Sequence, residues 1–271
     1  MTNAPAIPIP SATVLLLRDG MPGLEVFMVL RNAGIDFAGG ALVYPGGKSD
    51  PADLTDETAA YCDGVDGLNL VEIGNRVCGI RETFEEAGFL LAREKGRDTL
   101  VPGDRCLKLG AQYREAVHAG DLTMKDLAAQ EDLTLACDLM VPFARWITPS
   151  RSPKRFDTWF FLARAPEDQS GSHDQTESVD SLWISPDAAL NGAADQTYNI
   201  VFATRCNLSK VGRGATVAEA LETAKREPIV PVEPDITVLD DNRVSFKIPM
   251  EAGYGFDEEI ETNGPTVIWR S

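Results

Sequence analysis

Histidine is scarce in this sequence. Only His118 and His173 occur among its 271 residues, so a metal centre built from several imidazoles is not expected. The five cysteines are odd in number and widely spaced along the chain. This pattern fits neither a disulfide framework nor a zinc site, and it favours reduced thiols in a cytoplasmic protein.

Long apolar runs and targeting signals are also missing. No stretch is long and apolar enough to span a membrane, and residues 1–10 lack the basic start and apolar middle of a signal peptide. The chain ends Ile268-Trp269-Arg270-Ser271, which is not a peroxisomal address. We therefore expect a cytoplasmic location and no membrane partner.

Positive charge is in short supply. The 25 lysines and arginines are outnumbered by 42 aspartates and glutamates, which gives a formal net charge of −17 at pH 7. Nucleic acids and anionic membranes bind basic surfaces, so neither is an expected partner. An acidic protein that acts on phosphate anions needs local neutralisation, which cations held by carboxylates could supply.

Apolar residues recur at helical spacing between residues 75 and 87, which predicts a helix over Asn75–Ala87. Gly88 follows the last periodic position and would end this helix. The apolar stripe consists of Val77, Ile80, Phe84 and Ala87.

Carboxylates crowd another face of the same helix. Glu82, Glu85 and Glu86 stand at i, i+3 and i+4, and Arg81 precedes Glu85 by four residues, which is close enough to pair with it. Adjacent carboxylates repel one another unless a hard divalent cation such as Mg²⁺ lies among them. The cluster therefore predicts a metal site, with a solvated acidic helix face as the alternative.

The segment Arg81-Glu82-Thr83-Phe84-Glu85-Glu86-Ala87-Gly88 resembles the core of the Nudix box, with Phe89 in the last apolar place and Thr83 as a mild departure. Upstream, Tyr44-Pro45-Gly46-Gly47 is similar to the strand and turn that lead into such a box. Asp53 stands where the family has Glu, and 27 residues separate it from Arg81 where the family has seven. A box interrupted in this way resembles that of coenzyme A diphosphatase-like Nudix proteins of animal peroxisomes.

This resemblance implies a Nudix α/β/α sandwich with a mixed central sheet. It also implies Mg²⁺- or Mn²⁺-dependent hydrolysis of a diphosphate linkage in a nucleoside diphosphate linked to another moiety. By analogy, the metal ligands would be Glu82, Glu85 and Glu86. Arg81 would orient a glutamate, and Gly46 and Gly47 would let the backbone approach the site. Glu177 occupies a place where many Nudix proteins carry an acidic residue that helps to activate water.

Coenzyme A or an acyl-coenzyme A is the leading substrate, and its cleavage would give adenosine 3′,5′-bisphosphate and a phosphopantetheine. A coenzyme A-associated motif of the family precedes the box, and Arg31, Gly40 and residues 44–47 agree with it. Asn32 and Asp36 replace its serine and its second arginine. The alternatives are a nucleotide-sugar or ADP-ribose diphosphatase, and a non-catalytic Nudix-fold nucleotide-binding or regulatory protein.

A short basic loop stands out in this acidic chain. Its cations are Arg151, Lys154 and Arg155, and the run Arg155-Phe156-Asp157-Thr158 is similar to a segment of the same peroxisomal subgroup. The loop could hold substrate phosphates. The alternative is a solubilising turn in which Arg155 and Asp157 form a structural pair.

We expect one Nudix domain over residues 8–271. Residues 48–75 would form an insertion within the box, and residues 192–271 a C-terminal extension that packs on the core or covers a homodimer surface. Strands are expected at Ser11–Leu17, Leu24–Leu30, Ala41–Tyr44, Asp138–Trp146, Thr158–Ala163 and Ser181–Ile184. Helices are expected at Asp56–Cys62, Tyr113–Ala119, Met124–Glu131, from Ser185 onward and at Val217–Arg226. In the extension, Thr237–Leu239 and Val244–Ile248 are expected to pair as a hairpin.

Overall fold

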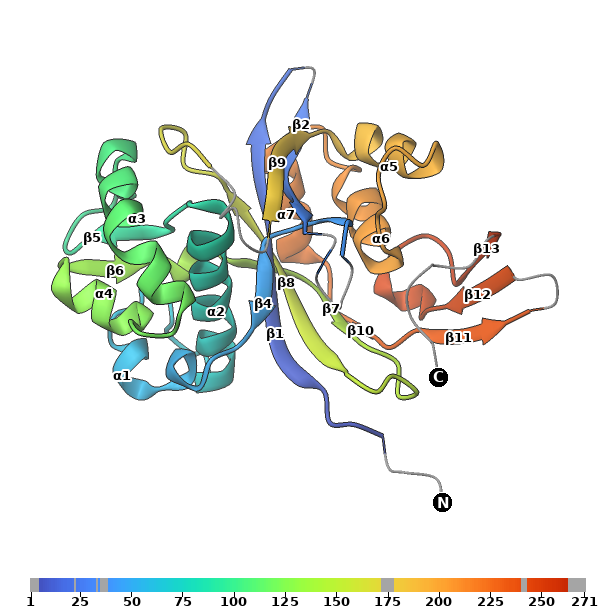
Figure 1. Cartoon of the computed structure of the whole chain (residues 1–271), viewed down its shortest axis with the longest axis horizontal. Helices are drawn as coiled ribbons and strands as arrows, with labels where there is room; N and C mark the ends of the chain where they lie inside the picture. Colours follow the sequence, from blue (N-terminus) through green and yellow to red (C-terminus); the bar gives the residue numbers. More distant parts are fainter. Residues whose placement is uncertain are drawn as a thin grey trace.

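The structure, a computed structural model, describes residues 5–21, 23–32, 34, 39–171, 178–239 and 243–262 of the chain. A central sheet runs through the molecule and helices cover both of its faces (Figure 1). On one side lie α1 (Asp56–Ala59), α2 (Leu70–Ala87), α3 (Gly103–His118) and α4 (Met124–Gln130). On the other lie α5 (Pro186–Ala194), α6 (Phe202–Val211) and α7 (Val217–Arg226). The expected α/β/α sandwich is confirmed.

The central sheet is mixed, as expected. Its order is β10 (Pro231–Val232), β7 (Val141–Ile147), β8 (Phe156–Arg164), β1 (Ile9–Asp19), β2 (Leu24–Arg31) and β3 (Leu42–Val43). In addition, β4 (Gly46–Lys48) pairs with β1, and β9 (Ser178–Ile184) pairs with β2. Strand β1 runs parallel to β8 and antiparallel to β2 and β4. It therefore borders three strands and lies in the middle of the sheet.

The apolar run in β1 is explained by burial on both faces. Side chains alternate across a strand. Val14 and Leu16 join the core on the α2 side, while Leu15 and Leu17 join the core on the α6 and α7 side. All four are fully buried. A strand covered on both faces is expected to be continuously apolar rather than alternating.

Helix α2 begins earlier than its apolar periodicity predicted. The side chain of Asn69 accepts hydrogen bonds from the backbone amides of Val71 and Glu72, at 3.0 and 3.1 Å, and Glu72 completes a capping box. The helix ends at Gly88, which adopts the left-handed conformation with φ 71°. Residues 70–75, which the sequence placed in the insertion, therefore form the first turns of α2.

The rest of the insertion folds as two short helical turns. The 3₁₀ turn η1 (Pro51–Leu54) is capped by Asp50, and α1 is capped by Thr55. Helix α1 is shorter than the expected Asp56–Cys62 because it ends at Ala59. Several apolar side chains of the insertion pack against the α2-side core, namely Ala59, Tyr61, Cys62, Val65 and Leu68. The insertion is therefore partly a layer of the core.

Other expected boundaries are also wrong, and β9 begins at Ser178 rather than Ser181. Helix α3 starts at Gly103 rather than Tyr113. The sequence did not mark this start, because Pro102 provides no side-chain cap. Strand β7 starts at Val141, since residues 137–139 form the 3₁₀ turn η2 (Cys137–Leu139). Helix α6 was not predicted, and it too has no side-chain cap.

The C-terminal extension lies against the sheet face opposite α2. Its helices contribute Leu208, Val211, Ala220 and Ala224 to the core on that side. Trp146 of β7 donates a hydrogen bond from Nε1 to the hydroxyl of Tyr254, 2.8 Å away. This buried contact joins residues 108 positions apart and ties the extension to the sheet.

Two small sheets complete the described structure. Strand β5 (Ala92–Glu94) pairs with β6 (Leu133–Leu135), and a second sheet contains β11 (Asp235–Val238), β12 (Arg243–Lys247) and β13 (Glu258–Thr262). The expected hairpin of the extension is formed by β11 and β12, and β13 adds a strand that was not predicted. None of the helices within the described ranges is long and apolar enough to cross a membrane.

Candidate active site around Arg81

The three clustered glutamates of α2 are buried. Glu82, Glu85 and Glu86 are 7%, 5% and 3% exposed, respectively. A carboxylate is rarely buried without a partner, because water solvates its charge far better than protein does. The alternative of a solvated acidic helix face is therefore excluded.

Arg81 is the shared partner of two of these carboxylates, Glu82 and Glu85. Its Nη1 donates to Oε1 of Glu82 and to Oε1 of Glu85, both at 2.9 Å. The expected pairing of Arg81 with Glu85 is thus confirmed. Its Nη2 donates to the main-chain oxygen of Lys48, 2.7 Å away. One guanidinium fork, with five donors in fixed directions, joins helix α2 to strand β4.

Asp53 is a further acidic hydrogen-bond partner of Arg81. Its Oδ2 lies 3.1 Å from Nη2 and 3.2 Å from Nε of Arg81, and the residue is 3% exposed. The same carboxylate accepts a hydrogen bond from the amide of Asp50 at 2.9 Å, as part of the cap of η1. The long interruption of the box left the role of this residue in doubt. In the folded chain, Asp53, near the start of the insertion, contacts Arg81 despite the interruption of the box.

The two glycines of the preceding motif lie directly against the glutamates. The amide of Gly46 donates to Oε2 of Glu86 at 2.9 Å. A Cβ atom on Gly47 would lie 2.6 Å from Oε1 of Glu82, and one on Gly46 would lie 2.6 Å from the main-chain oxygen of Ala12. A side chain at Gly46 would collide with the backbone of β1, and one at Gly47 would displace the carboxylate of Glu82. Both glycines lie in strand β4 rather than in the expected turn.

In this cluster, burial and the charge of Arg81 have opposite effects on the pKa of the carboxylates. Burial raises the pKa of Glu82 to about 7, against the opposing effect of Arg81. Burial also raises the pKa of Asp53, which Arg81 partly offsets. The guanidinium of Arg81 is itself buried, yet the carboxylates of Glu82 and Asp53 hold its pKa above the usual value. A single cation thus faces several buried acids, and further positive charge would stabilise their ionised forms.

The carboxylate oxygens of Glu82, Glu85 and Glu86 suit a hard divalent cation, although in this structure they contact Arg81 and Gly46 instead. Among the described residues, no three His, Cys, Asp or Glu side chains converge on one point. Glu82 and Glu85 face Arg81, and Glu86 faces the amide of Gly46. Buried carboxylate oxygens are nevertheless the ligands that Mg²⁺ and Mn²⁺ prefer. By chemistry these residues fit such a cation.

Helix α3 supports the site from the outside, which the sequence did not predict. Arg114 donates from Nε to the main-chain oxygen of Glu85, 2.6 Å away. His118, four residues further along α3, places Nδ1 3.5 Å from Oε2 of Glu85. The only sequence signal for His118 was the scarcity of histidine.

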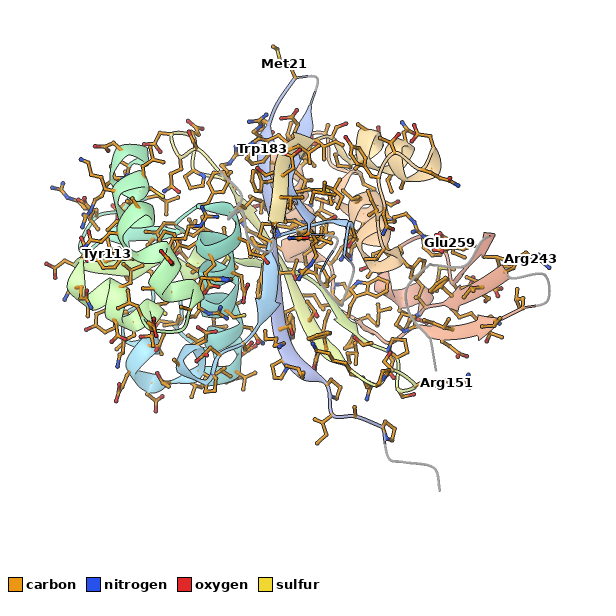
Figure 2. The ribbon with its side chains drawn as sticks, in the orientation of Figure 1. Met21, Tyr113, Arg151, Trp183, Arg243 and Glu259 are labelled. Carbon is orange, nitrogen blue, oxygen red and sulfur yellow. The ribbon has the colours of Figure 1, made fainter. Side chains whose placement is uncertain are left out.

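The basic loop lies apart from the glutamates. Figure 2 places Arg151 at the tip of the β7–β8 hairpin at lower right, across the central sheet from α2. Lys154 lies over the ring of Phe156, 5.4 Å from its centroid. Of the predicted substrate contacts, the structure gathers only Gly46 and Gly47 around the glutamates.

Arg155 is buried among structural partners. Its Nε donates to the main-chain oxygen of Thr148 at 2.8 Å, and its Nη1 to that of Ala6 at 3.0 Å. Its Nη2 donates to Glu233 in the extension at 2.9 Å. The expected pair of Arg155 and Asp157 is wrong, because Asp157 accepts two hydrogen bonds from Arg145, at 2.8 and 2.6 Å.

Of three further residues of interest, the structure describes only Arg31. Arg31 is half-buried at the end of β2, where its amide donates to the main-chain oxygen of Ala41 at 2.9 Å. Glu177, the candidate base, and Asp36, the departure from the coenzyme A motif, both lie outside the described residues.

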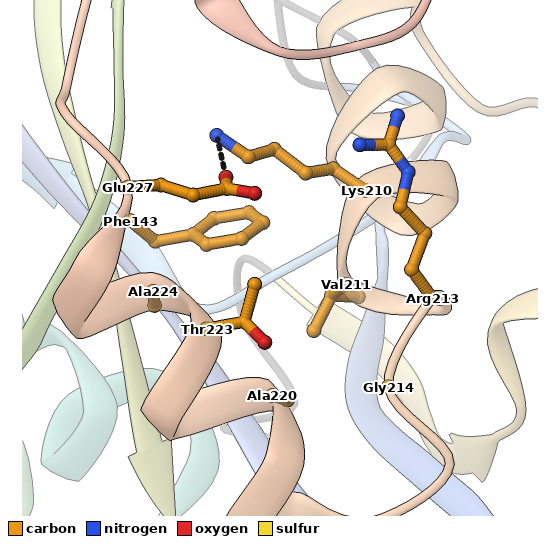
Figure 3. A pocket seen from close by; sticks show the side chains of 9 residues that line it. All are labelled: Phe143, Lys210, Val211, Arg213, Gly214, Ala220, Thr223, Ala224 and Glu227. Atoms are coloured by element: carbon orange, nitrogen blue, oxygen red, sulfur yellow. Dashed lines mark ion pairs between the residues drawn. The ribbon is translucent and has the colours of Figure 1, made fainter.

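Two cavities lie away from the glutamates. The first, of about 50 Å³, lies between α6 and α7, where Lys210 pairs with Glu227 at 3.1 Å (Figure 3). It is far smaller than ordinary ligand pockets of roughly 300–1,000 Å³. The second, of about 280 Å³, is bordered by Arg18, Arg164 and Trp183 near the ends of β1 and β8.

Comparison with known proteins agrees with the geometry around Arg81. A family model described as the NUDT19 Nudix domain matches residues 64–203. The acyl-coenzyme A diphosphatase NUDT19 of Xenopus laevis is 24% identical over 204 residues, covering 61% of this chain and 54% of that protein. The protein of the same name from Gallus gallus is 28% identical over 242 residues, covering 66% and 61%. The chain thus spans a little over half the length of these relatives.

A solved structure supports the same fold. The crystal structure of a Nudix hydrolase from Alicyclobacillus acidocaldarius matches with a TM-score of 0.62 and 26% identity. The match covers 82% of this chain and 99% of that one.

Proposed function

Since the chain belongs to the NUDT19 Nudix domain family, we propose that it is a metal-dependent hydrolase of the diphosphate linkage in coenzyme A or an acyl-coenzyme A. The membership inferred from the interrupted box is confirmed. The relatives named acyl-coenzyme A diphosphatase support the choice of substrate. Cytoplasmic location and homodimer formation remain predictions from the sequence.

The assembly around Arg81 supports hydrolysis most directly. Despite the insertion, Asp53, Glu82 and Glu85 converge on one guanidinium, and Gly47 lies against Glu82. The complete run of glutamates on α2 favours a catalytic protein over one that only binds nucleotides. Glu82, Glu85 and Glu86 would hold Mg²⁺ or Mn²⁺, and Arg81 would fix the orientation of Glu82 and Glu85.

The metal ion and the glycines of β4 would have different roles. A bound Mg²⁺ or Mn²⁺ would supply Lewis-acid polarisation of the diphosphate oxygens and make water a better nucleophile. The glycines of β4 would admit the diphosphate close to the backbone, where a side chain would block it. One water adds across the P–O–P linkage, so coenzyme A would yield adenosine 3′,5′-bisphosphate and phosphopantetheine. Glu177 stays a candidate base on sequence grounds alone.

Substrate choice should depend on the 3′-phosphate, which ADP-ribose and nucleotide sugars lack. Of the proposed phosphate contacts, Arg155 is already held by Thr148, Ala6 and Glu233. Arg31 is the strongest remaining candidate, because it lies beside the segment that leads into β4. Arg151 and Lys154 lie on the exposed hairpin and are weaker candidates.

A substrate screen tests the proposal. The full chain is incubated with Mg²⁺ or Mn²⁺ and with coenzyme A, an acyl-coenzyme A, ADP-ribose and a nucleotide sugar, and the products are identified by mass spectrometry. We expect kcat/KM to be highest for the coenzyme A compounds. A preference for ADP-ribose or a nucleotide sugar would move the assignment to that class. Tight nucleotide binding without cleavage would indicate a regulatory protein instead.

A further inference from the structure

Helix α3 contacts Glu85 at two points one helical turn apart. Arg114 binds the main-chain oxygen of Glu85, and His118 lies 3.5 Å from its carboxylate. The side chain of Glu85 is 7% exposed, whereas that of His118 is 35% exposed and lies at the edge of the site. Arg114 fixes where the backbone of Glu85 lies, and His118 is placed to fix the direction of its side chain.

We propose that His118 is a positioning residue for Glu85, holding one carboxylate oxygen so that the group can serve a divalent cation. This inference rests on the proposed function. The two oxygens of Glu85 meet different partners, since Oε1 accepts from Nη1 of Arg81 and Oε2 faces Nδ1 of His118. The carboxylate is thus approached from two elements, α2 and α3.

Arg81 cannot fix this carboxylate alone. Its guanidinium is shared among Asp53, Glu82, Glu85 and the main-chain oxygen of Lys48. If Glu82 and Glu85 are to hold a cation, their hydrogen bonds to Arg81 would have to lengthen or turn. A second donor on another helix keeps the carboxylate aligned through that change. Groups that support a metal-binding side chain typically affect metal affinity or activity about 10–100-fold.

The geometry specifies which replacement should retain the role. Nδ1 must carry the hydrogen to donate to Oε2, so His118 would act as the Nδ1–H tautomer. Asparagine can place an amide N–H near the position of Nδ1, whereas alanine removes the donor. Gln112, exposed on the same helix, gives a control substitution that is also neutral and does not contact α2 through any hydrogen bond or ion pair described for the chain.

The experiment compares wild type with His118→Ala, His118→Asn and Gln112→Ala. Mn²⁺ binding is measured without substrate by electron paramagnetic resonance, and kcat and KM for coenzyme A are measured at saturating metal. Thermal unfolding reports the fold. We expect His118→Ala to weaken Mn²⁺ binding about tenfold and to lower kcat with little change in KM or Tm. His118→Asn should recover most of both losses, and Gln112→Ala should match wild type.

Two results overturn the inference. One is a His118→Ala protein that binds Mn²⁺ and turns over like an active wild type. The other is an equal loss in His118→Ala and His118→Asn with lowered Tm, which would mean that the imidazole only packs. A wild type that neither binds Mn²⁺ nor cleaves any diphosphate would overturn the proposed function itself, and the inference with it.

Discussion

At the scale of single residues, the site depends on one guanidinium that neutralises a set of buried acids. Arg81 donates to three acidic side chains, those of Asp53, Glu82 and Glu85, and its positive charge offsets theirs. Lysine offers a point charge rather than a planar fork and could not serve these acceptors together. The chemistry of the site therefore depends on hydrogen-bond directions as well as on charge.

Glu86 provides the cleanest test of the carboxylates. Glu86→Gln keeps an oxygen that can accept the hydrogen bond from Gly46, but it removes the negative charge that a cation needs. We expect kcat to fall about a hundredfold, while Tm stays near that of wild type. Steady-state kinetics and thermal unfolding check this. Glu115→Gln, an exposed change on α3, is the control, and normal turnover in Glu86→Gln would remove Glu86 from the metal site.

Arg31 is the residue on which substrate discrimination should depend. If it contacts the 3′-phosphate, wild type should prefer coenzyme A to dephospho-coenzyme A, and Arg31→Ala should reduce that preference about tenfold. The ratio of the two kcat/KM values is the measurement, and Arg151→Ala on the exposed hairpin is the comparison. Equal values for both substrates in wild type would show that the 3′-phosphate is not recognised.

At the scale of elements, the insertion has a larger role than a surface excursion. A surface excursion would face substrate or a second subunit and would stand apart from the chemistry. Instead the insertion places Asp53 on Arg81, and Tyr61, Val65 and Leu68 pack on the core. Shortening residues 55–68 to a tight loop would therefore remove core packing and would not report on substrate binding alone.

Asp53→Asn tests whether the insertion contributes to catalysis better than shortening the insertion does. The asparagine fits the same space but loses the charge that holds Arg81. We expect kcat to fall about tenfold, because Arg81 orients Glu82 and Glu85 less firmly. Asp56→Asn, an exposed change in the same insertion, should leave kcat unchanged. If Asp53→Asn is fully active, the insertion contributes only to packing.

The far end of the insertion is held by an ion pair that predicts a pH dependence. Arg93 donates to both carboxylate oxygens of Asp138, at 2.7 and 2.8 Å, and to Asp63 of the insertion at 3.3 Å. These bonds hold the pKa of Asp138 below its usual value. The folded state thus favours the ionised form. The stabilisation is present above the unfolded pKa and is lost as pH falls through the folded pKa.

Asp138→Asn should therefore lower the free energy of unfolding at pH 7 and lower it less at pH 3, where the stabilisation of wild type is already reduced. Urea unfolding at both pH values measures the difference. Asp121→Asn, an exposed change after α3, is the control. A deficit of equal size at both pH values would show that the loss comes from packing, not from the ion pair.

At the scale of the whole molecule, the sequence predicted the architecture better than the contacts. Local patterns such as the stripe on α2 and the apolar run of β1 marked the sandwich correctly. Two helices have no side-chain cap: the predicted range of α3 was too short, and α6 was not predicted. The contacts of Asp53 with Arg81 and of His118 with Glu85 join residues far apart in the chain. Local periodicity in the sequence cannot predict such contacts.

The central claim is that the carboxylates around Arg81 make this chain a metal-dependent diphosphatase. The most direct measurement is ³¹P NMR of coenzyme A incubated with the full chain and Mn²⁺ in ¹⁸O-labelled water, after removal of the metal by chelation. We predict loss of the diphosphate signals, growth of phosphomonoester signals and one ¹⁸O atom in one of the two products. Chelator added at the start, or Glu86→Gln, should suppress all three. Cleavage that persists with chelator, or an intact diphosphate with both Mg²⁺ and Mn²⁺, would contradict the claim.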